Sequence, residues 1–311
     1  MPQSLVPSWM LALLVGSGFV CQGTMQTGAA EPVAPVAKGA AAEIRTAEDL
    51  LAALEDADKG VHTLRAQIVY ERYMYMQDES QIRYGSLYFR NERDAADAPP
   101  RRAFAITLEH MLVDDVMRLD QKHYIFDGEW LVEKILEEKL FRKMRIARPG
   151  ERSDPFRVGE KDSMLVPLPV GQEKDAVLAR YEAELLPAQS GLESEKDVEF
   201  RKFVADAWQL RLVPREEFAK EDRFTEIRLW YERDTLMPMM SRAVHREGDI
   251  STVQLVGVKK NDPQFPAAVI HIDPPQEEGW IIRIDEGRFA PRDEDASPAA
   301  DAAGEKGNTQ E

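Results

Sequence analysis

Apolar and polar residues alternate along much of the chain with the period of two that predicts β-strands. Residues 64–76 form the longest such run, and residues 103–109 alternate strictly. One face of the first run carries Leu64, Ala66, Ile68, Tyr70, Met74 and Met76, and one face of the second carries Phe104, Ile106 and Leu108. The other face of 64–76 becomes aromatic at Tyr73 and Tyr75. Partly apolar faces on both sides are typical of a sheet that is covered on one side and lines a cavity on the other.

A hairpin is predicted at the centre of the chain. Apolar runs at 124–126 and 130–132 flank Asp127-Gly128. Asp-Gly between two such runs favours a type I′ turn, in which both central residues have positive φ. The charged residues 133–139 are expected at a solvated strand edge before the next strand.

Two helices are predicted from apolar residues at helical spacing. The first covers residues 46–59, where Thr46 as N-cap and Asp49 three residues later approximate a capping box. The second begins near Lys174 and ends at Pro187.

The whole pattern predicts a mainly β protein of the α+β class. We expect an unclosed antiparallel β-barrel or strongly curved sheet of about ten or eleven strands, with two or three covering helices. Loops are expected at residues 91–102, 147–172 and 188–198. Further strands are expected at 81–90, within 111–118, and at 139–146, 208–212, 224–231, 236–246, 250–259, 268–272 and 280–284.

Charge and cysteine content exclude several classes of protein. The 311 residues carry a net charge of −16, which disfavours nucleic acid and stable insertion into an anionic membrane. Cys21 is the only cysteine, so neither a disulfide within the chain nor a Cys-based zinc site is possible.

The N-terminal segment predicts export. Residues 10–21 have the length of a signal-peptide core and are too short to span a bilayer, and small residues precede a cleavage point near Ala30. The alternative is a lipid anchor on Cys21, although Val20 does not fit the small residue required there. The expected organisation is a signal peptide at 1–30, a flexible leader at 31–44, one domain at 45–285 and a disordered acidic tail at 286–311. The product is expected to be a periplasmic monomer.

The order of several motifs resembles one family. These are Gly85-Ser86-Leu87-Tyr88-Phe89-Arg90, residues 124–131 around Asp127-Gly128, and Leu229-Trp230-Tyr231 followed by Asp234, Leu236 and Pro238. Together with the export signal, they resemble a LolA-type outer-membrane lipoprotein carrier of the larger, divergent kind. The resemblance covers about residues 47–259.

The resemblance implies a half-barrel whose apolar cavity takes up acyl chains of lipoproteins or related lipids. It also implies an inner-membrane release complex and an outer-membrane acceptor as partners, with no cofactor. In the family, an Arg after the Gly-x-Leu-aromatic strand helps to hold a lid closed. Arg90 is the nearest match, although Asn91 stands where the family has Pro.

An acyl chain requires only a dry apolar wall, which stabilises it by about 0.8 kcal/mol per buried methylene. Each single candidate for this wall is also an ordinary core residue, so only the set argues for a cavity. The candidates are Tyr70, Met74, Met76, Tyr88, Phe89, Phe104, Ile106, Phe126, Trp130, Leu131, Trp208, Leu229 and Trp230.

An enzyme is disfavoured, because the sequence has no Gly-x-Ser-x-Gly and its five histidines show no metal-ligand spacing. We therefore predict no catalytic residue and no metal site. The remaining alternative is a non-catalytic envelope module of the same fold that binds or senses lipid or protein.

Arginines on the strands leave a further choice open. They would either bind an anion inside the sheet or pair with strand-face carboxylates, and ion pairing is favoured. The arginines are Arg65, Arg72, Arg83, Arg90 and Arg228, and the expected partners are Glu71, Glu226 and Glu232.

Overall fold

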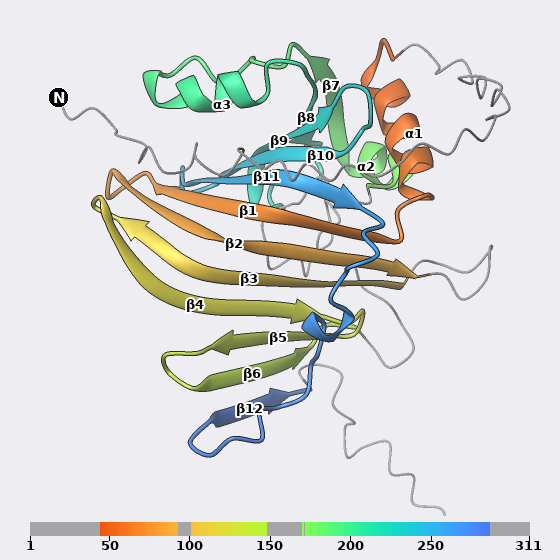
Figure 1. Cartoon of the computed structure of the whole chain (residues 1–311). Helices are drawn as coiled ribbons and strands as arrows, with labels where there is room; N and C mark the ends of the chain where they lie inside the picture. The colour runs from red at the N-terminus through yellow and green to blue at the C-terminus, as the bar shows by residue number, and fades with distance from the viewer. Residues whose placement is uncertain (1–43, 93–100, 148–169, 171, 287–311) are drawn as a thin grey trace, which may run out of the picture. The chain divides into compact units, whose positions relative to one another are not determined.

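One twelve-stranded sheet forms the framework of the computed structural model, which describes residues 44–92, 101–147, 170 and 172–286 (Figure 1). Its strand order is β12-β6-β5-β4-β3-β2-β1-β11-β10-β9-β8-β7, so β12 and β7 are edges and the sheet is not closed. This confirms the predicted open, mainly β architecture with few helices. The predicted signal peptide lies outside the described residues, as does all but the first residue of the acidic tail.

The strands are antiparallel except at one edge, where β12 pairs in parallel with β6. Their bounds are β1 Thr63–Met74, β2 Glu79–Glu92, β3 Arg101–Val113, β4 Val116–Phe126, β5 Trp130–Ile135, β6 Leu140–Arg145, β7 Tyr181–Leu186, β8 Ala207–Pro214, β9 Phe224–Glu232, β10 Pro238–His245, β11 Ile250–Lys260 and β12 Ile281–Asp285. The α-helices are α1 Ala47–Asp58, α2 Lys174–Arg180 and α3 Val198–Phe203, and short 3₁₀ turns occupy Glu195–Asp197 and Ala267–Val269.

The sheet has two faces with separate cores. The inner face is the one that carries Leu64, Ile68, Leu87, Phe104 and Phe126, which pack in a single apolar cluster. These residues belong to β1 to β4, and their spacing by two along each strand is the expected alternation. The opposite, outer face carries Ala105, Ile125, Val132 and Phe141.

Helices α1 and α2 cover the β7–β10 half of the inner face. Leu50, Leu51 and Leu54 of α1 pack with Val177 of α2 and with apolar residues of β7 to β10. The N-terminus of α1 has the predicted capping box, because Thr46 accepts from the Asp49 amide and Asp49 accepts from the Thr46 amide. Helix α1 therefore begins where the sequence predicts.

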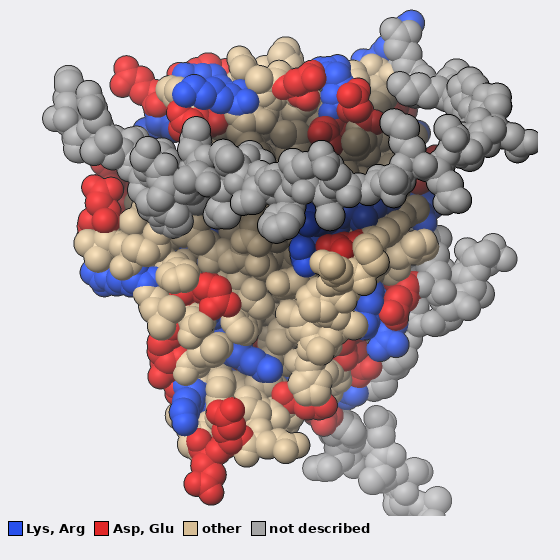
Figure 2. Space-filling model, viewed as in Figure 1, with Lys and Arg blue, Asp and Glu red and all other residues tan. Residues whose placement is uncertain are grey.

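The outer face is covered by other parts of the chain. Trp230 and Met240 pack with Val204 and Leu192 around α3. The connection from β11 to β12 crosses in front of the lower strands in Figure 1 and packs Val269, Ile270 and Trp280 on the sheet. Charged side chains of both signs are interspersed over the visible described part of this side (Figure 2).

Several local predictions are wrong. The helix expected from Lys174 to Pro187 ends at Arg180, because Tyr181–Leu186 pairs with β8 as strand β7. The strand expected at 268–272 is a 3₁₀ turn at Ala267–Val269. The exposed loop at 188–198 instead leads through a 3₁₀ turn into α3, and buries Leu192. In each case tertiary packing overrides a short local pattern.

The central turn forms, but not as type I′. Gly128 has a φ of +108°, whereas the φ of Asp127 is not positive. The Asp127 carboxylate instead accepts hydrogen bonds from the amides of Glu129 and Trp130, at 2.9 and 2.8 Å. The Asp127 side chain thus supplies a hydrogen-bond acceptor for both of these backbone amides.

Gly85 is required by a close approach of two strands. A Cβ placed on Gly85 would lie 1.9 Å from the Thr107 carbonyl oxygen of β3. The register between β2 and β3 shifts between Tyr84 and Gly85, and glycine is common at such irregularities. The glycine of the Gly-x-Leu-aromatic motif therefore has a structural function.

A buried ion pair fixes α1 to the sheet. Arg102 of β3 places its Nη2 2.9 Å from Oδ2 of Asp58, at the C-terminus of α1, and the two side chains are 6% and 12% exposed. We expect Arg102→Leu to lower the free energy of unfolding by about 3–5 kcal/mol, because it breaks a buried ion pair. Urea unfolding followed by tryptophan fluorescence measures the loss.

The matched control is Arg101→Leu, a neighbouring exposed arginine on the same strand, which should change stability by no more than about 0.5 kcal/mol. The double variant Arg102→Leu with Asp58→Leu should recover part of the loss, since it removes both charges. Equal losses for Arg101→Leu and Arg102→Leu would contradict the anchoring role.

Candidate functional site

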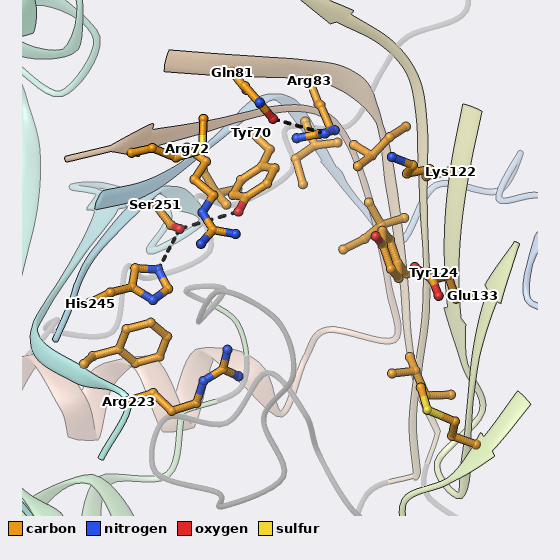
Figure 3. A pocket seen from close by; sticks show the side chains of 18 residues that line it. Tyr70, Arg72, Gln81, Arg83, Lys122, Tyr124, Glu133, Arg223, His245 and Ser251 are labelled. Carbon is orange, nitrogen blue, oxygen red and sulfur yellow. Dashed lines mark hydrogen bonds between the residues drawn. The ribbon is translucent and has the colours of Figure 1, made fainter. Parts of the chain in front are cut away.

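A pocket of about 450 Å³ opens on the inner face, over the half of the sheet that lies beyond α1 and α2 (Figure 3). This volume is within the range of sites that bind small molecules. Strands β1 to β6 contribute Ile68, Tyr70, Arg72, Met74, Gln81, Arg83, Ile106, Leu108, Lys122, Tyr124, Leu131, Glu133 and Met144. The β9–β11 side contributes Arg223, Phe224, His245, Ser251 and Val253.

The floor of the pocket is apolar. Four strands, β1, β3, β5 and β11, contribute nearly fully buried side chains to it, namely Ile68, Ile106, Leu108, Leu131 and Val253. They meet because inner-face residues on neighbouring strands are paired side by side. Such a floor binds hydrocarbon without requiring hydrogen bonds from it.

The space between α1 and the sheet is almost filled. The pocket bounded there by Leu54, Val61 and Tyr231 has a volume of only about 30 Å³. Side chains of α1 contact the sheet directly in this region. The main pocket therefore lies beside α1 and not under it.

Polar side chains line one wall of the main pocket. Asp120 forms ion pairs with Arg83 at 3.1 Å and with Lys122 at 3.1 Å. Burial, with a contribution from Glu133, raises the pKa of Tyr124 to about 12, so its hydroxyl stays protonated at neutral pH. The wall therefore offers hydrogen-bond donors next to an apolar floor.

A second polar group lies across the pocket (Figure 3). His245 Nε2 is 2.8 Å from Ser251 Oγ, and the Tyr70 hydroxyl is 3.5 Å from the same oxygen. Arg72 lies beside this group and pairs with Asp249 at 3.0 Å. Burial lowers the pKa of His245, and the positive charges of Arg72 and Arg223 lower it further.

The Ser251–His245 contact resembles part of a nucleophile–base pair, but the remaining parts are not found among the described residues. No described carboxylate accepts a hydrogen bond from His245 Nδ1, and Ser251 is 1% exposed. Within the same residues, no group of three or more His, Cys, Asp or Glu side chains is arranged to hold a metal ion.

The structure divides the predicted cargo residues among several places. Four line the main pocket, namely Tyr70, Met74, Ile106 and Leu131. Three more, Phe89, Phe104 and Phe126, are buried in the inner-face core that continues from it.

The other six lie elsewhere. Tyr88 packs on the outer face, and Trp130 lies under Lys143 and Arg145. Leu229 and Trp208 are in the core beneath α1 and α2, Trp230 is in the core around α3, and Met76 is 85% exposed.

Arg90 is not placed as the sequence suggests. Its Nε lies 3.2 Å from Oε1 of Glu92, two residues along the same strand, and alternation puts Arg90 on the same face as Tyr88, away from the main pocket. The buried arginine that joins a helix to the sheet is Arg102, which the sequence analysis assigned to a loop. The role of Arg90 in holding a lid closed stays a prediction, and the geometry of its pair with Glu92 does not favour it.

The strand arginines do form ion pairs, as the favoured alternative predicts. Arg228 pairs with Glu226 at 2.6 Å, but the other partners differ from those expected. Arg65 pairs with Asp262, Arg72 with Asp249, Arg83 with Asp120 and Arg90 with Glu92. Arg72 and Arg83 nevertheless also line the pocket.

Sequence reasoning named Arg72 and Arg83 as possible anion ligands but missed the rest of the polar half of the pocket. Arg72, Lys122, Glu133 and Met144 share the inner face by simple alternation with Tyr70, Tyr124, Leu131 and Ile146. That signal was available from the strand pattern. His245, Ser251 and Arg223 join them only through the pairing of β1 with β11 and of β10 with β9, which no local pattern contains.

Comparison with known proteins finds similarity only among solved structures. No family model matches the sequence, and no curated protein matches it. Among the described residues, no helix has the length and hydrophobicity needed to cross a membrane.

Three solved structures illustrate the similarity. The MucA/MucB complex of Pseudomonas aeruginosa is 14% identical, with a TM-score of 0.35 over 72% of this chain and 60% of that one. A putative outer membrane lipoprotein-sorting protein domain from Vibrio parahaemolyticus is 9% identical, with a TM-score of 0.33 over 71% and 95%. A LolA superfamily protein from Nitrosomonas europaea is 11% identical, with a TM-score of 0.25 over 73% and 98%.

These structures include LolA-type and lipoprotein-sorting proteins. This chain spans about three fifths of the MucB-containing chain. At such identities and TM-scores the similarity carries no argument about ligand, partner or function. Any such argument must rest on the pocket itself.

The lowered pKa of His245 makes stability depend on pH. An imidazole whose folded pKa lies below its unfolded value of about 6.5 binds fewer protons when folded, so the free energy of unfolding falls as pH falls below that value. We expect His245→Gln to lose less stability than the wild type between pH 7 and pH 5. The difference should be at most about 1.4 kcal/mol per pH unit.

Urea titrations at several pH values measure this slope. His123, whose pKa burial also lowers, remains in both proteins and so does not affect the comparison. Met76→Gln, which removes no titratable group and lies at a position that is 85% exposed, is the matched control and should keep the wild-type slope. An unchanged slope in His245→Gln would contradict the buried, cation-flanked environment described for this ring.

Proposed function

We propose that the protein is an exported, periplasmic carrier that binds the acyl chains of lipoproteins or related lipids in the inner-face pocket and delivers them toward the outer membrane. The single observation that carries this proposal is the apolar floor of a pocket of about 450 Å³ on an open sheet. The LolA-like resemblance of the sequence agrees with it.

The chemistry of the pocket suits hydrocarbon of variable length. Its floor is built from aliphatic side chains, and two flexible methionines, Met74 and Met144, line it on β1 and β6. Thioether side chains adapt to ligands of different shape. The same chemistry favours release of the acyl chain to an acceptor, because hydrophobic contacts are non-directional and involve no covalent bond.

We expect monoacylglycerols to bind with an affinity that rises with chain length. Each added methylene should tighten binding about fourfold, from about 0.8 kcal/mol per methylene, until the pocket is filled. Titration of the full chain with monoacylglycerols of 8 to 16 carbons, followed by tryptophan fluorescence, measures this series. No dependence on chain length would argue against a hydrocarbon site.

Met144→Glu tests the location of the site. A carboxylate at this half-buried pocket position should weaken the binding of monoacylglycerol about tenfold or more. This corresponds to the loss of contacts with roughly two methylene groups. The control is Met76→Glu, the same substitution at a methionine that is 85% exposed outside the pocket. Equal effects of the two substitutions would remove the pocket as the binding site.

A protein-binding or sensing module is the second candidate, and the edge strand β12 favours it. Ile281, Ile282 and Ile284 are 54%, 46% and 56% exposed on this edge. Exposed apolar edge strands pair readily with an added strand. Two results together would support this candidate over the carrier. The purified protein would contain no acyl lipid, and its β12 amides would become protected from hydrogen exchange when envelope proteins are added.

A further inference from the structure

The residues that line the main pocket are arranged in rows across the sheet, because paired residues on neighbouring strands lie side by side on one face. The register of the strands gives the order of these rows. From the outermost row inward they are Arg72, Gln81 and Ser251; Tyr70, Arg83 and Val253; Ile68, Leu108 and Lys122; Ile106, Tyr124 and Glu133; and Leu131 and Met144. The pocket is therefore a groove that crosses several strands.

The groove is open at its first row and closed at its last. The side chain of Arg72 is 47% exposed, whereas Leu131 is 1% exposed. Strand pairing continues the row of Leu131 through Phe126, Phe104 and Phe89, and each of these three is at most 2% exposed. The ring centroids of Phe104 and Phe126 are 5.5 Å apart. A packed row of phenylalanines therefore closes the inner end.

The sides of the groove are also occupied. Between α1 and the sheet, the pocket beside the groove has a volume of only about 30 Å³. Near the open end, Phe224 packs edge-on against His245, with ring centroids 4.9 Å apart. In Figure 3, Tyr124 and Glu133 lie on one side of the pocket and His245 lies on the other. Within the described residues, hydrocarbon therefore has one apolar path, which leads from the Arg72 row to Leu131.

The volume of the groove matches one acyl chain. A methylene group occupies about as much space as a water molecule in the liquid, roughly 30 Å³. The pocket volume of about 450 Å³ therefore corresponds to roughly fifteen methylene groups. One chain of about 14–16 carbons fills this space, and a second chain of the same length would require about twice the volume.

We propose that the groove binds one acyl chain at a time, with the end of the chain at Leu131 and Met144, and that the protein selects lipids with a single chain of about 14–16 carbons. This proposal rests on the proposed hydrocarbon-binding function. It narrows the ligand from acyl chains in general to a single-chain lipid. The second chain of a two-chain lipid stays outside the groove and adds little to its affinity.

Lipids with equal numbers of acyl carbons test the single-chain groove. The full chain is titrated with 1-palmitoylglycerol, 1,2-dioctanoylglycerol and 1-octanoylglycerol, each below the concentration at which it aggregates. 1-Palmitoylglycerol should bind about a hundredfold or more tightly than 1,2-dioctanoylglycerol, because only one octanoyl chain enters the groove. 1,2-Dioctanoylglycerol should bind within about threefold of 1-octanoylglycerol, because its second chain makes no contact there. Equal affinities of 1-palmitoylglycerol and 1,2-dioctanoylglycerol would overturn the single-chain groove and leave the carrier function intact.

Leu131→Ala tests the closed end of the groove. It removes three carbon atoms from the last row, so the chain length that binds most tightly should increase by about three carbons. Monoacylglycerols of 8 to 20 carbons measure this optimum. Met144→Ala, at a half-buried position of the same row, should shift the optimum in the same direction at a smaller cost in stability, and it decides the question if Leu131→Ala does not fold.

The matched control is Leu119→Ala, the same substitution at a residue that is 60% exposed and does not line the pocket. Its optimum should equal that of the wild type. An unchanged optimum in both Leu131→Ala and Met144→Ala would overturn the assignment of the closed end.

Native mass spectrometry counts the bound lipids. One molecule of 1-palmitoylglycerol per protein is expected, and two bound molecules would overturn the single-chain groove. Failure of all three lipids to bind would overturn the hydrocarbon pocket itself, which distinguishes that result from failure of the single-chain assignment alone.

Discussion

The structure depends on one constraint, which is that a twelve-stranded sheet with apolar residues on both faces must cover each face. Helices α1 and α2 cover the inner face over β7 to β10, and α3 with the β11–β12 connection covers much of the outer face. The pocket lies on the inner face, where residues of β1 to β6 and of β9 to β11 line it. The site is thus the part of the sheet where apolar side chains from many strands converge beside the covering helices.

The ion pair between Arg102 and Asp58 follows from the same constraint. Helix α1 packs on the inner face through leucines, and its C-terminus lies next to β3. Hydrophobic contact is non-directional and sets no unique orientation for the helix, whereas a buried arginine–carboxylate pair requires a definite one. The pair therefore favours one orientation of α1 on the sheet.

Polar residues in the pocket arise from the alternation that builds its floor. On β1, Ile68, Tyr70, Arg72 and Met74 share one face, and the strand passes from apolar core to charged rim within these residues. A ligand on the inner face would therefore contact hydrocarbon near the middle of the strand and cations near its end. This gradient distinguishes the pocket from a closed core.

Local pattern was sufficient for much of the fold. The alternation at 64–76 and 103–109 determined which residues share the inner face, the Thr46 and Asp49 pair determined where α1 begins, and Asp127-Gly128 determined where β4 turns back. Each depends on neighbours within a few residues, so the sequence alone contains the answer. The turn type at Asp127 was missed because a side-chain carboxylate competes with the backbone preference.

Tertiary structure alone decided the rest. Aromatic content could not separate Tyr70, which lines the pocket, from Trp230, which packs under α3, because both alternate correctly on apolar strands. Residues 181–186 became a strand only through pairing with β8, and Arg223, His245 and Ser251 met Arg72 only through the pairing of distant strands. The sequence determined the strands and their faces, since these follow from a period of two. Which face is hollow, and which charges meet there, depends on contacts between strands far apart in the chain.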